Sequence, residues 1–558
     1  MSGTRRKVVV LGIDGGTLSL VGPWARRGEL PNLARLIATG ASGALRSTMH
    51  PLTPQAWTSF LTGVNPGKHG VFDFGRRREG SYELTLTDAL CRRAPAIWSY
   101  LEPHGLTTGL INIPLTFPLA PVHGFQISGM HTPVLEEAVG PKSLLQEIRE
   151  VAPDYQIDVM SPWYAEMDSF LADVQRMTVD RSKVAVHLYQ KYRPDLMILV
   201  LVAVDRVSHA LYEQMSHPEH HNCDGRAGWK YSGEVLRAYK AVDRALGDLL
   251  RVLEDDTVVV VMSDHGFGPL KRDVSLNQFL LQRGLMSFSP RKVRPRLPVT
   301  GVPVGQAGRT SLEALWDGVR RVVPPLRWYD DRRIRQGQIP LELRRWEYVD
   351  WDRTVAYSHG FFGNVYINLK GREPRGCVDP ADYIAVRERV ARQLEVALTD
   401  PDDGDTIIDH VFRKEELYHG PHVDEAPDLV VVMRGYSYIT RGGSELSATE
   451  VVSAPKVNHT GNHRLDGMLI LWGPGMRQGV KLHEASIMDV MPTILDTLGV
   501  ALPSDLDGRV LTEALEQPEH LMTIARRLLV QEEQGGRRLT AAEERLVRRR
   551  LRNLGYFE

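Results

Sequence analysis

Three short apolar segments of this chain lead, directly or after one serine, into an aspartate. The segments and their aspartates are Lys7–Ile13 with Asp14, Leu196–Val204 with Asp205, and Val258–Met262 with Asp264. Continuous runs rich in β-branched residues are typical of buried strands in a parallel sheet. In open α/β sheets, ligands bind outside the carboxyl ends of the strands. The pattern therefore predicts that the three carboxylates meet at one edge of a sheet.

Carboxylates that lie this close together need a cation, because buried like charges repel strongly. Two imidazoles accompany them: His209 comes four residues after Asp205, and His265 directly follows Asp264. The sequence thus predicts a metal site whose ligands come from strands far apart in the chain.

Length and composition narrow the class of protein. The 558 residues are enough for two or three domains, and a net charge of −1 gives no overall attraction to nucleic acid or to an anionic membrane. The three cysteines match no metal motif and indicate a reducing compartment. No apolar run approaches the roughly 20 residues of a transmembrane helix, and the N-terminus does not resemble a signal peptide. We therefore expect a soluble, cytoplasmic protein.

Alternating strand-like and helix-like segments predict an α/β fold, with a doubly wound, mostly parallel sheet and helices on both faces. The stretch from 271 to 404 interrupts this rhythm with many prolines and arginines. We expect a discontinuous catalytic core formed by 1–270 and 405–515, an inserted lid or cap over 271–404, and a C-terminal helical tail over 516–558. Thr540 and Glu543 have the spacing of a capping box at a helix start.

Thr53 stands where a reactive hydroxyl could lie. It precedes Pro54, which suits an N-cap followed by proline at the first helical position, and Gly63 and Pro66 would end the helix. A hydroxyl at a helix N-terminus is well placed to meet an anion such as a phosphate group. An ordinary capping threonine would have the same pattern.

Taken in order, these segments resemble the alkaline phosphatase superfamily. The resemblance rests on Asp14, on Thr53 ahead of TSFLTGVNPGKHG, on Asp205-x-x-x-His209, on Ser263-Asp264-His265-Gly266, and on His463 in GNHRLDG. It is strongest for the type I phosphodiesterase/nucleotide pyrophosphatase branch, and it implies an alkaline-phosphatase-like fold.

The resemblance also implies two divalent metal ions. Asp205, His209 and His463 would hold one, while Asp14, Asp264, His265 and the Thr53 oxygen would hold the other. Mixed histidine and carboxylate ligands suit catalytic Zn²⁺, and Mn²⁺ remains an alternative. His459 lies four residues before His463 and is a rival ligand or a substrate contact.

The activity implied is that of a two-metal phosphoesterase acting on a small phosphate ester. We expect a phosphodiesterase that forms a phospho-threonine intermediate at Thr53. A phosphomonoesterase or phosphomutase of the same superfamily is the alternative, and a non-catalytic binding protein is a remote one. We expect no specific binding to nucleic acid.

One departure from the family concerns the asparagine that nucleotide pyrophosphatases carry shortly after the threonine. The residues here read Gln55-Ala56-Trp57-Thr58, and Gln55, Thr58 or a backbone N–H could replace it. Further along the chain, His359 and Asn364 flank a glycine- and aromatic-rich turn. This turn either lines a substrate pocket or simply packs against the core.

Overall fold

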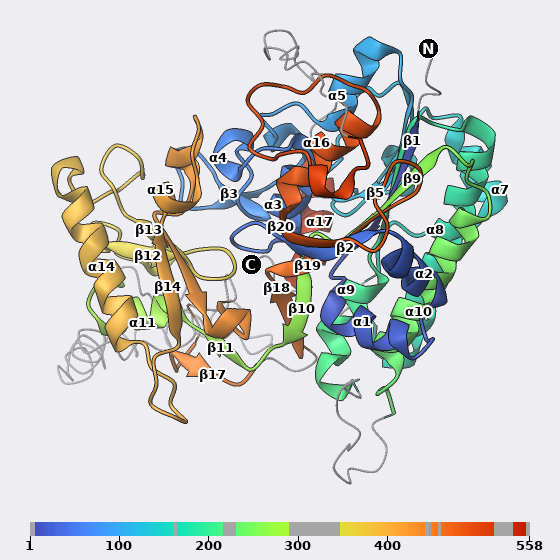
Figure 1. The fold of residues 1–558 in the computed structure, drawn as a ribbon. Coiled ribbons are helices and arrows are strands. Elements are labelled where there is room, and N and C mark those ends of the chain that lie inside the picture. The colour runs from blue at the N-terminus through green and yellow to red at the C-terminus, as the bar shows by residue number, and fades with distance from the viewer. Residues whose placement is uncertain are drawn as a thin grey trace, which may run out of the picture.

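The three apolar segments are adjacent strands of a nine-stranded, mostly parallel sheet in the computed structural model (Figure 1). The model describes residues 6–159, 164–215, 230–289, 346–440, 446, 448–455, 459–517 and 539–553, and the rest of the predicted lid and tail lies outside these ranges. Within them the strand order is β20-β2-β19-β9-β1-β8-β5-β6-β7. The bounds are β1 Lys7–Ile13, β2 Ala41–Arg46, β5 Thr108–Ile113, β6 Gly124–Ser128, β7 Val139–Gly140, β8 Leu196–Leu201, β9 Thr257–Met262, β19 Asp466–Trp472 and β20 Lys481–Ser486.

The pairing within this sheet brings the predicted ligands together. β1 lies between β8 and β9 and runs parallel to both, so the carboxyl ends of all three strands meet. β19 is antiparallel to β9 and to β2. Every residue of β8 and of β9 is buried, as expected for strands covered on both faces.

Helices cover both faces of the large sheet (Figure 1). One group packs around α10, whose apolar side chains Val235, Tyr239, Val242, Leu246 and Leu249 are buried. On the other face, α3 packs against α16. The bounds are α1 Leu18–Arg26, α2 Pro31–Thr39, α3 Thr53–Thr62, α4 Pro66–His69, α5 Ile97–Leu101, α6 Leu135–Ala138, α7 Leu144–Val151, α8 Met167–Tyr192, α9 Ala203–Leu211, α10 Glu234–Leu250 and α16 Ile487–Thr497.

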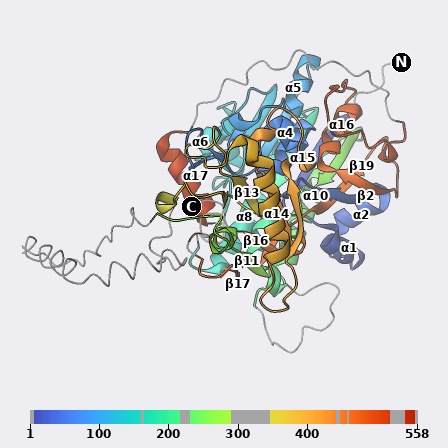
Figure 2. The same ribbon diagram turned by 90° about the vertical axis from the view of Figure 1, so that its left-hand side faces the viewer.

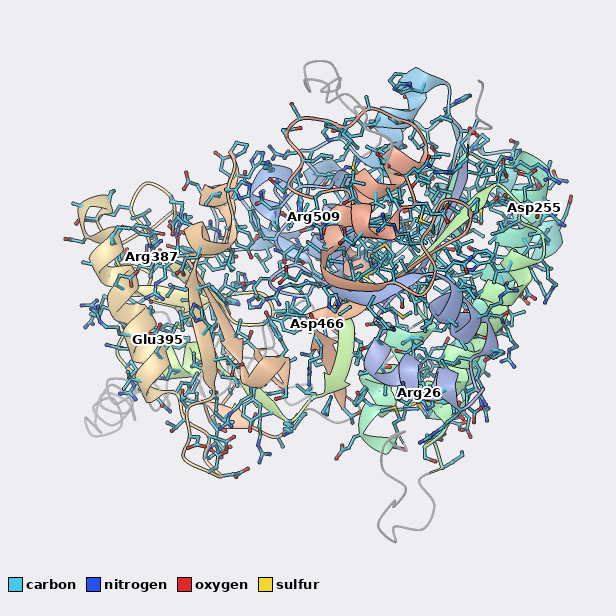
Figure 3. All side chains as sticks on the ribbon, in the orientation of Figure 1. Arg26, Asp255, Arg387, Glu395, Asp466 and Arg509 are labelled. Atoms are coloured by element: carbon cyan, nitrogen blue, oxygen red, sulfur yellow. The ribbon has the colours of Figure 1, made fainter. Side chains whose placement is uncertain are left out.

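Some charged residues lie at the edge of this layered core. Arg26 of α1 and Asp255, which precedes β9, are exposed at its edge (Figure 3).

A second apolar core lies beside the first and has its own four-stranded antiparallel sheet, in the order β12-β13-β15-β14. Helix α14 covers this sheet and faces the viewer in Figure 2. The bounds are β12 Ala356–Ser358, β13 Asn364–Ile367, β14 Ile408–Arg413, β15 Leu429–Met433, α11 Leu276–Gln282 and α14 Tyr383–Ala397. β14 and β15 were expected with the catalytic core, so the division between the sheets does not coincide with the predicted boundary at 404.

Smaller sheets of two or three short strands complete the described fold. β10 (Gly266–Pro269) is antiparallel to β18 (Gly461–Arg464), which sets Phe267 opposite His463. β11 (Arg272–Val274) lies between β16 (Tyr438–Thr440) and β17 (Val452–Ser453). β3 (Gly75–Arg77) and β4 (Leu84–Leu86) form a hairpin.

The C-terminal helix α17 (Ala541–Asn553) packs onto the molecule through the buried side chains of Val547 and Leu551. It begins with the predicted capping box: Thr540 N donates to Glu543 Oε2 at 2.7 Å, and Glu543 N donates to Thr540 Oγ1 at 3.3 Å. Among the described residues, no helix combines the length and apolar character required to cross a bilayer.

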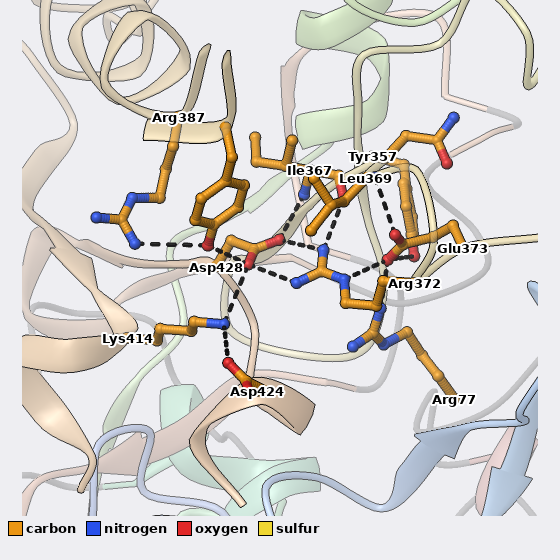
Figure 4. Close-up of polar contacts among 12 residues, drawn as sticks. Arg77, Tyr357, Ile367, Leu369, Arg372, Glu373, Arg387, Lys414, Asp424 and Asp428 are labelled. Carbon is orange, nitrogen blue, oxygen red and sulfur yellow. Dashed lines mark hydrogen bonds and ion pairs between the residues drawn. The ribbon is translucent and has the colours of Figure 1, made fainter. Parts of the chain in front are cut away.

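A buried carboxylate organises the polar contacts of the smaller sheet (Figure 4). Asp428 accepts two hydrogen bonds from Arg372, at 2.7 and 2.5 Å, and one from Ile367 N at 2.7 Å. Arg372 also contacts Glu373 at 2.9 Å, and Glu373 pairs with Arg77 of β3 at 2.5 Å. The network therefore joins the hairpin β3–β4 to the smaller sheet.

Replacing Arg372 by methionine is expected to destabilise the protein by about 3–5 kcal/mol, because it leaves the buried carboxylate of Asp428 short of its strongest partner. Urea unfolding followed by circular dichroism measures the change. The control is Arg375→Met, which breaks an ion pair whose side chains are 41% and 64% exposed and should cost at most about 1 kcal/mol. Equal losses in the two variants would contradict this account.

Candidate metal centre

The first candidate ligand set consists of Asp205, His209 and His463, whose ligand atoms lie within 4.8 Å of one another. Asp205 Oδ1 lies 3.3 Å from the Nε2 atoms of both histidines. The apolar segment before Asp205 does not remain a strand throughout, because β8 ends at Leu201 and α9 begins at Ala203. Asp205 thus lies on the first turn of α9 and His209 one turn later, which puts both side chains on the same helix face.

The second set consists of Asp14, Asp264 and His265, again within 4.8 Å of one another. His265 Nε2 lies 3.7 Å from Asp14 Oδ1 and 3.2 Å from Asp264 Oδ2. The two sets adjoin, since the rings of His265 and His463 stack with their centroids 3.6 Å apart. The resemblance to the alkaline phosphatase superfamily implies the same grouping of these six residues.

Backbone carbonyls orient the three imidazoles. The Nδ1 atoms of His209, His265 and His463 lie 3.1, 3.1 and 2.8 Å from the oxygens of Gly461, Gly266 and Pro51. A proton on each Nδ1 would leave the Nε2 lone pair facing the carboxylates. This is the usual arrangement of metal-ligating histidines.

Unpaired buried oxygens test whether these residues fit a metal ion. Both carboxylate oxygens of Asp14, Oδ1 of Asp205 and Oδ2 of Asp264 are buried without a hydrogen-bond partner. Burial, together with the charge of Asp205, raises the pKa values of Asp14 and Asp264 well above their usual range. Such carboxylates call for a cation, so the two sets fit divalent metal ions.

Thr53 lies at the second set, but it does not cap the helix as predicted. The N-cap of α3 is Leu52, Thr53 is the first helical residue, and no side chain caps the helix. Thr53 Oγ1 instead lies 3.4 Å from His265 Nε2. Gly63 ends the helix in a left-handed conformation, with φ 64°. The hydroxyl therefore points at the ligand cluster rather than at its own backbone.

Other predicted residues are engaged elsewhere. Gln55 donates to Met49 O at 3.1 Å and to Tyr418 Oη at 3.3 Å, and Thr58 donates to Pro54 O at 2.6 Å. These bonds use the donors that either residue would offer to a phosphate group. His459 contacts the first set, with its Nε2 2.9 Å from His209 Nδ1.

The turn around His359 and Asn364 reaches the metal centre through a residue that the sequence did not single out. The ring of Phe362 lies 5.7 Å from that of His463, measured between centroids. His359 packs 4.7 Å from the ring of Trp346, and Asn364 donates to Asp73 Oδ2 at 3.1 Å.

Sequence reasoning also missed Arg206 and Asp158. Arg206 forms ion pairs with both Asp205 and Asp158. The position of Arg206 directly after a ligand was a usable signal. Asp158 stands in no motif.

The sheet, the paired ligand sets and the threonine define a class, the alkaline-phosphatase-like metal-dependent hydrolases. Two crystal structures of phosphonoacetate hydrolase from Sinorhizobium meliloti 1021, with phosphonoformate and with phosphonoacetate, match with TM-scores of 0.52 and 0.53. Both are 15% identical in sequence and cover 89% of this chain and 96% of the other. They confirm the predicted fold. The human ectonucleotide pyrophosphatase/phosphodiesterase 5 matches with a TM-score of 0.49 and 11% identity, over 92% of this chain and 100% of the other.

The sequence identifies the family within this class. Residues 8–466 match the model of the type I phosphodiesterase / nucleotide pyrophosphatase family, and the chain belongs to that family. It is therefore a metal-dependent phosphoric ester hydrolase, as the motifs predicted. No curated protein matches the chain.

Asp73, which lies between α4 and β3, holds the loop of Phe362, and this contact should depend on pH. Phe361 N donates to Asp73 Oδ2 at 3.1 Å. Burial raises the pKa of Asp73 to about 7, although hydrogen bonds from Phe361, Phe74 and Asn364 oppose the rise. In the unfolded chain the pKa is about 3.9, so the folded state holds the proton more tightly.

The contribution of this carboxyl is therefore full below about pH 4 and is lost as pH rises through about 7. Relative to Asp73→Asn, we expect the unfolding free energy of the wild type to fall by about 2–3 kcal/mol between pH 5 and pH 8. Urea unfolding of both proteins across that range is the measurement. A constant difference would contradict the assignment.

Proposed function

We propose that this protein hydrolyses small phosphodiesters in two steps through a phospho-threonine at Thr53, with two divalent metal ions held by the two ligand sets. The observation that carries the proposal is the position of Thr53 Oγ1, 3.4 Å from His265 Nε2 at the N-terminus of α3. Free backbone N–H groups and the helix dipole favour an anion there.

When bound, the two ions would supply Lewis-acid stabilisation and lower the pKa of a coordinated hydroxyl. In the first step Thr53 Oγ1 loses its proton and bonds to phosphorus, the bond to the leaving oxygen breaks, and the leaving alcohol gains a proton. Water then attacks the phosphorus and gives up a proton, the bond between Oγ1 and phosphorus breaks, Thr53 regains its proton, and a phosphomonoester is released. Phe362 lies close to the first ligand set. The part of the smaller sheet that falls within 271–404 would therefore act as the predicted lid.

The residue types also bear on the metal and on the compartment. Three histidine and carboxylate ligands around each ion, joined at the second ion by the Thr53 oxygen, suit Zn²⁺, and Mn²⁺ is the alternative. The few, scattered cysteines support a cytoplasmic location.

Replacing Thr53 by alanine should lower kcat by on the order of 10³-fold or more, because it removes the nucleophile. Metal content, measured by plasma mass spectrometry, should stay close to that of the wild type, since six other ligands remain. The control is Thr58→Ala, five residues later on α3, whose hydroxyl donates to Pro54 O and should matter little for kcat. Unchanged activity of the Thr53 variant would remove Thr53 as the nucleophile.

A comparison of two substrates separates diesterase from monoesterase activity. We expect kcat/KM for bis-p-nitrophenyl phosphate to exceed that for p-nitrophenyl phosphate. The reverse preference would favour a phosphomonoesterase, or a phosphomutase if the phosphoryl group moves within one molecule. Metal-loaded protein that turns over neither ester would favour a non-catalytic binding role.

A further inference from the structure

The two oxygens of the candidate ligand Asp205 have different environments. Oδ1 faces His209 Nε2 and His463 Nε2, each at 3.3 Å, and has no hydrogen-bond partner. Oδ2 accepts a hydrogen bond from the Nη1 group of Arg206. Oδ1 is therefore the oxygen of Asp205 that faces the two histidines, and Oδ2 is the oxygen that Arg206 contacts.

Arg206 is itself fixed in place by a second carboxylate. Its Nε and Nη2 groups donate to the two oxygens of Asp158, at 3.0 and 2.8 Å. This bidentate pairing fixes the plane of the guanidinium and leaves Nη1 directed at Asp205. The side chains of Asp158, Arg206 and Asp205 are only 8%, 2% and 1% exposed, so water cannot replace these bonds.

The C-terminal helix contributes to this burial. Asp158 lines a small cavity together with His131, and Val547, Arg550 and Leu551 of α17 close its other side. Arg550 fastens the helix there by donating to the carbonyl oxygens of Thr132 and Pro133, at 2.9 and 3.0 Å. Figure 2 shows α17 beside α6, the helix that begins two residues after Pro133. Because the Asp158–Arg206 ion pair is screened from solvent, it lies in a low dielectric, where its hydrogen bonds are electrostatically stronger than in water.

A buried ion pair could serve only to tie segment 157–159 to α9. One feature goes further than that. Arg206 donates a hydrogen bond from Nη1 to Oδ2 of a candidate ligand. Groups that hydrogen-bond to ligating side chains orient them toward the metal.

We propose that Arg206, held by Asp158, is a positioning residue that presents Oδ1 of Asp205 to the metal ion of the Asp205, His209 and His463 set. The inference rests on the two-metal site of the proposed function. It concerns metal affinity at one of the two sets and predicts little change at the other.

The test is titration calorimetry of Zn²⁺ into chelator-treated full-length protein. The double variant Asp158→Leu/Arg206→Met removes both buried charges at once, so neither is left unpaired. We expect one of the two Zn²⁺ sites to weaken about 10–100-fold, the other to keep its affinity, and turnover to recover at saturating Zn²⁺. Arg206→Lys keeps the charge but cannot contact both carboxylates as a planar fork does, so it should weaken the same site.

Arg372→Met is the matched control, because it breaks a buried bidentate pair in the smaller sheet, away from the metal centre. It should lower stability and leave both Zn²⁺ affinities unchanged. Wild-type affinity at both sites in Arg206→Lys or in the double variant would overturn the positioning role alone. Wild-type protein that binds no Zn²⁺ or Mn²⁺ would overturn the proposed function and this inference with it.

Discussion

Repulsion among three buried carboxylates is the constraint on which the rest of this structure depends. Asp14, Asp205 and Asp264 lie at one sheet edge with almost no exposure to water. Such a cluster is costly unless cations compensate it. The compensating features are concentrated there: imidazoles that backbone carbonyls hold in one orientation, one buried guanidinium, and the positive end of α3. Such an arrangement suits an anionic ester, because cations bound to the carboxylates would attract an anion that the carboxylates alone would repel.

The sequence predicted the parts of this arrangement that depend on local pattern. β-branched runs identified β1, β8 and β9. The geometry of parallel sheets then predicted that the aspartates after these strands meet at one edge of the sheet. Patterns that two structures can share were less informative. The run before Asp205 became partly helical, and the predicted capping role of Thr53 proved wrong, because a helix start can direct a hydroxyl either to its own backbone or to a neighbour. The apolar run Leu429–Met433 forms a strand of the smaller sheet, but an apolar sequence alone does not tell which of two sheets a strand joins. Asp158 and Phe362 lay beyond prediction, since each contacts the site only through long-range packing.

A turn of the smaller sheet reaches the place where the chemistry is proposed. Phe362 lies in the turn between β12 and β13, has φ 60°, and packs against His50 as well as His463. A residue other than glycine in that conformation is strained, and such strain is often found at functional sites. Asp73, between α4 and β3, holds the flanking backbone through the Phe361 N–H group. The smaller sheet thus contributes a loop residue that packs beside the ligand His463. Loops around a site commonly determine which substrate a member of a family accepts.

The pairing of β10 with β18 also affects when the site can exist. It sets Phe267 opposite His463, across nearly two hundred intervening residues that include the whole smaller sheet. During synthesis, strands β1, β8 and β9 can associate well before His463 leaves the ribosome, so a growing chain carries its acidic edge with only part of the compensating groups. Closing so long a loop is entropically costly and slow. The complete set of ligands is then among the last features to form. A chain that ends before residue 463 would lack His463, the ligand of the first set that stacks on His265 of the second.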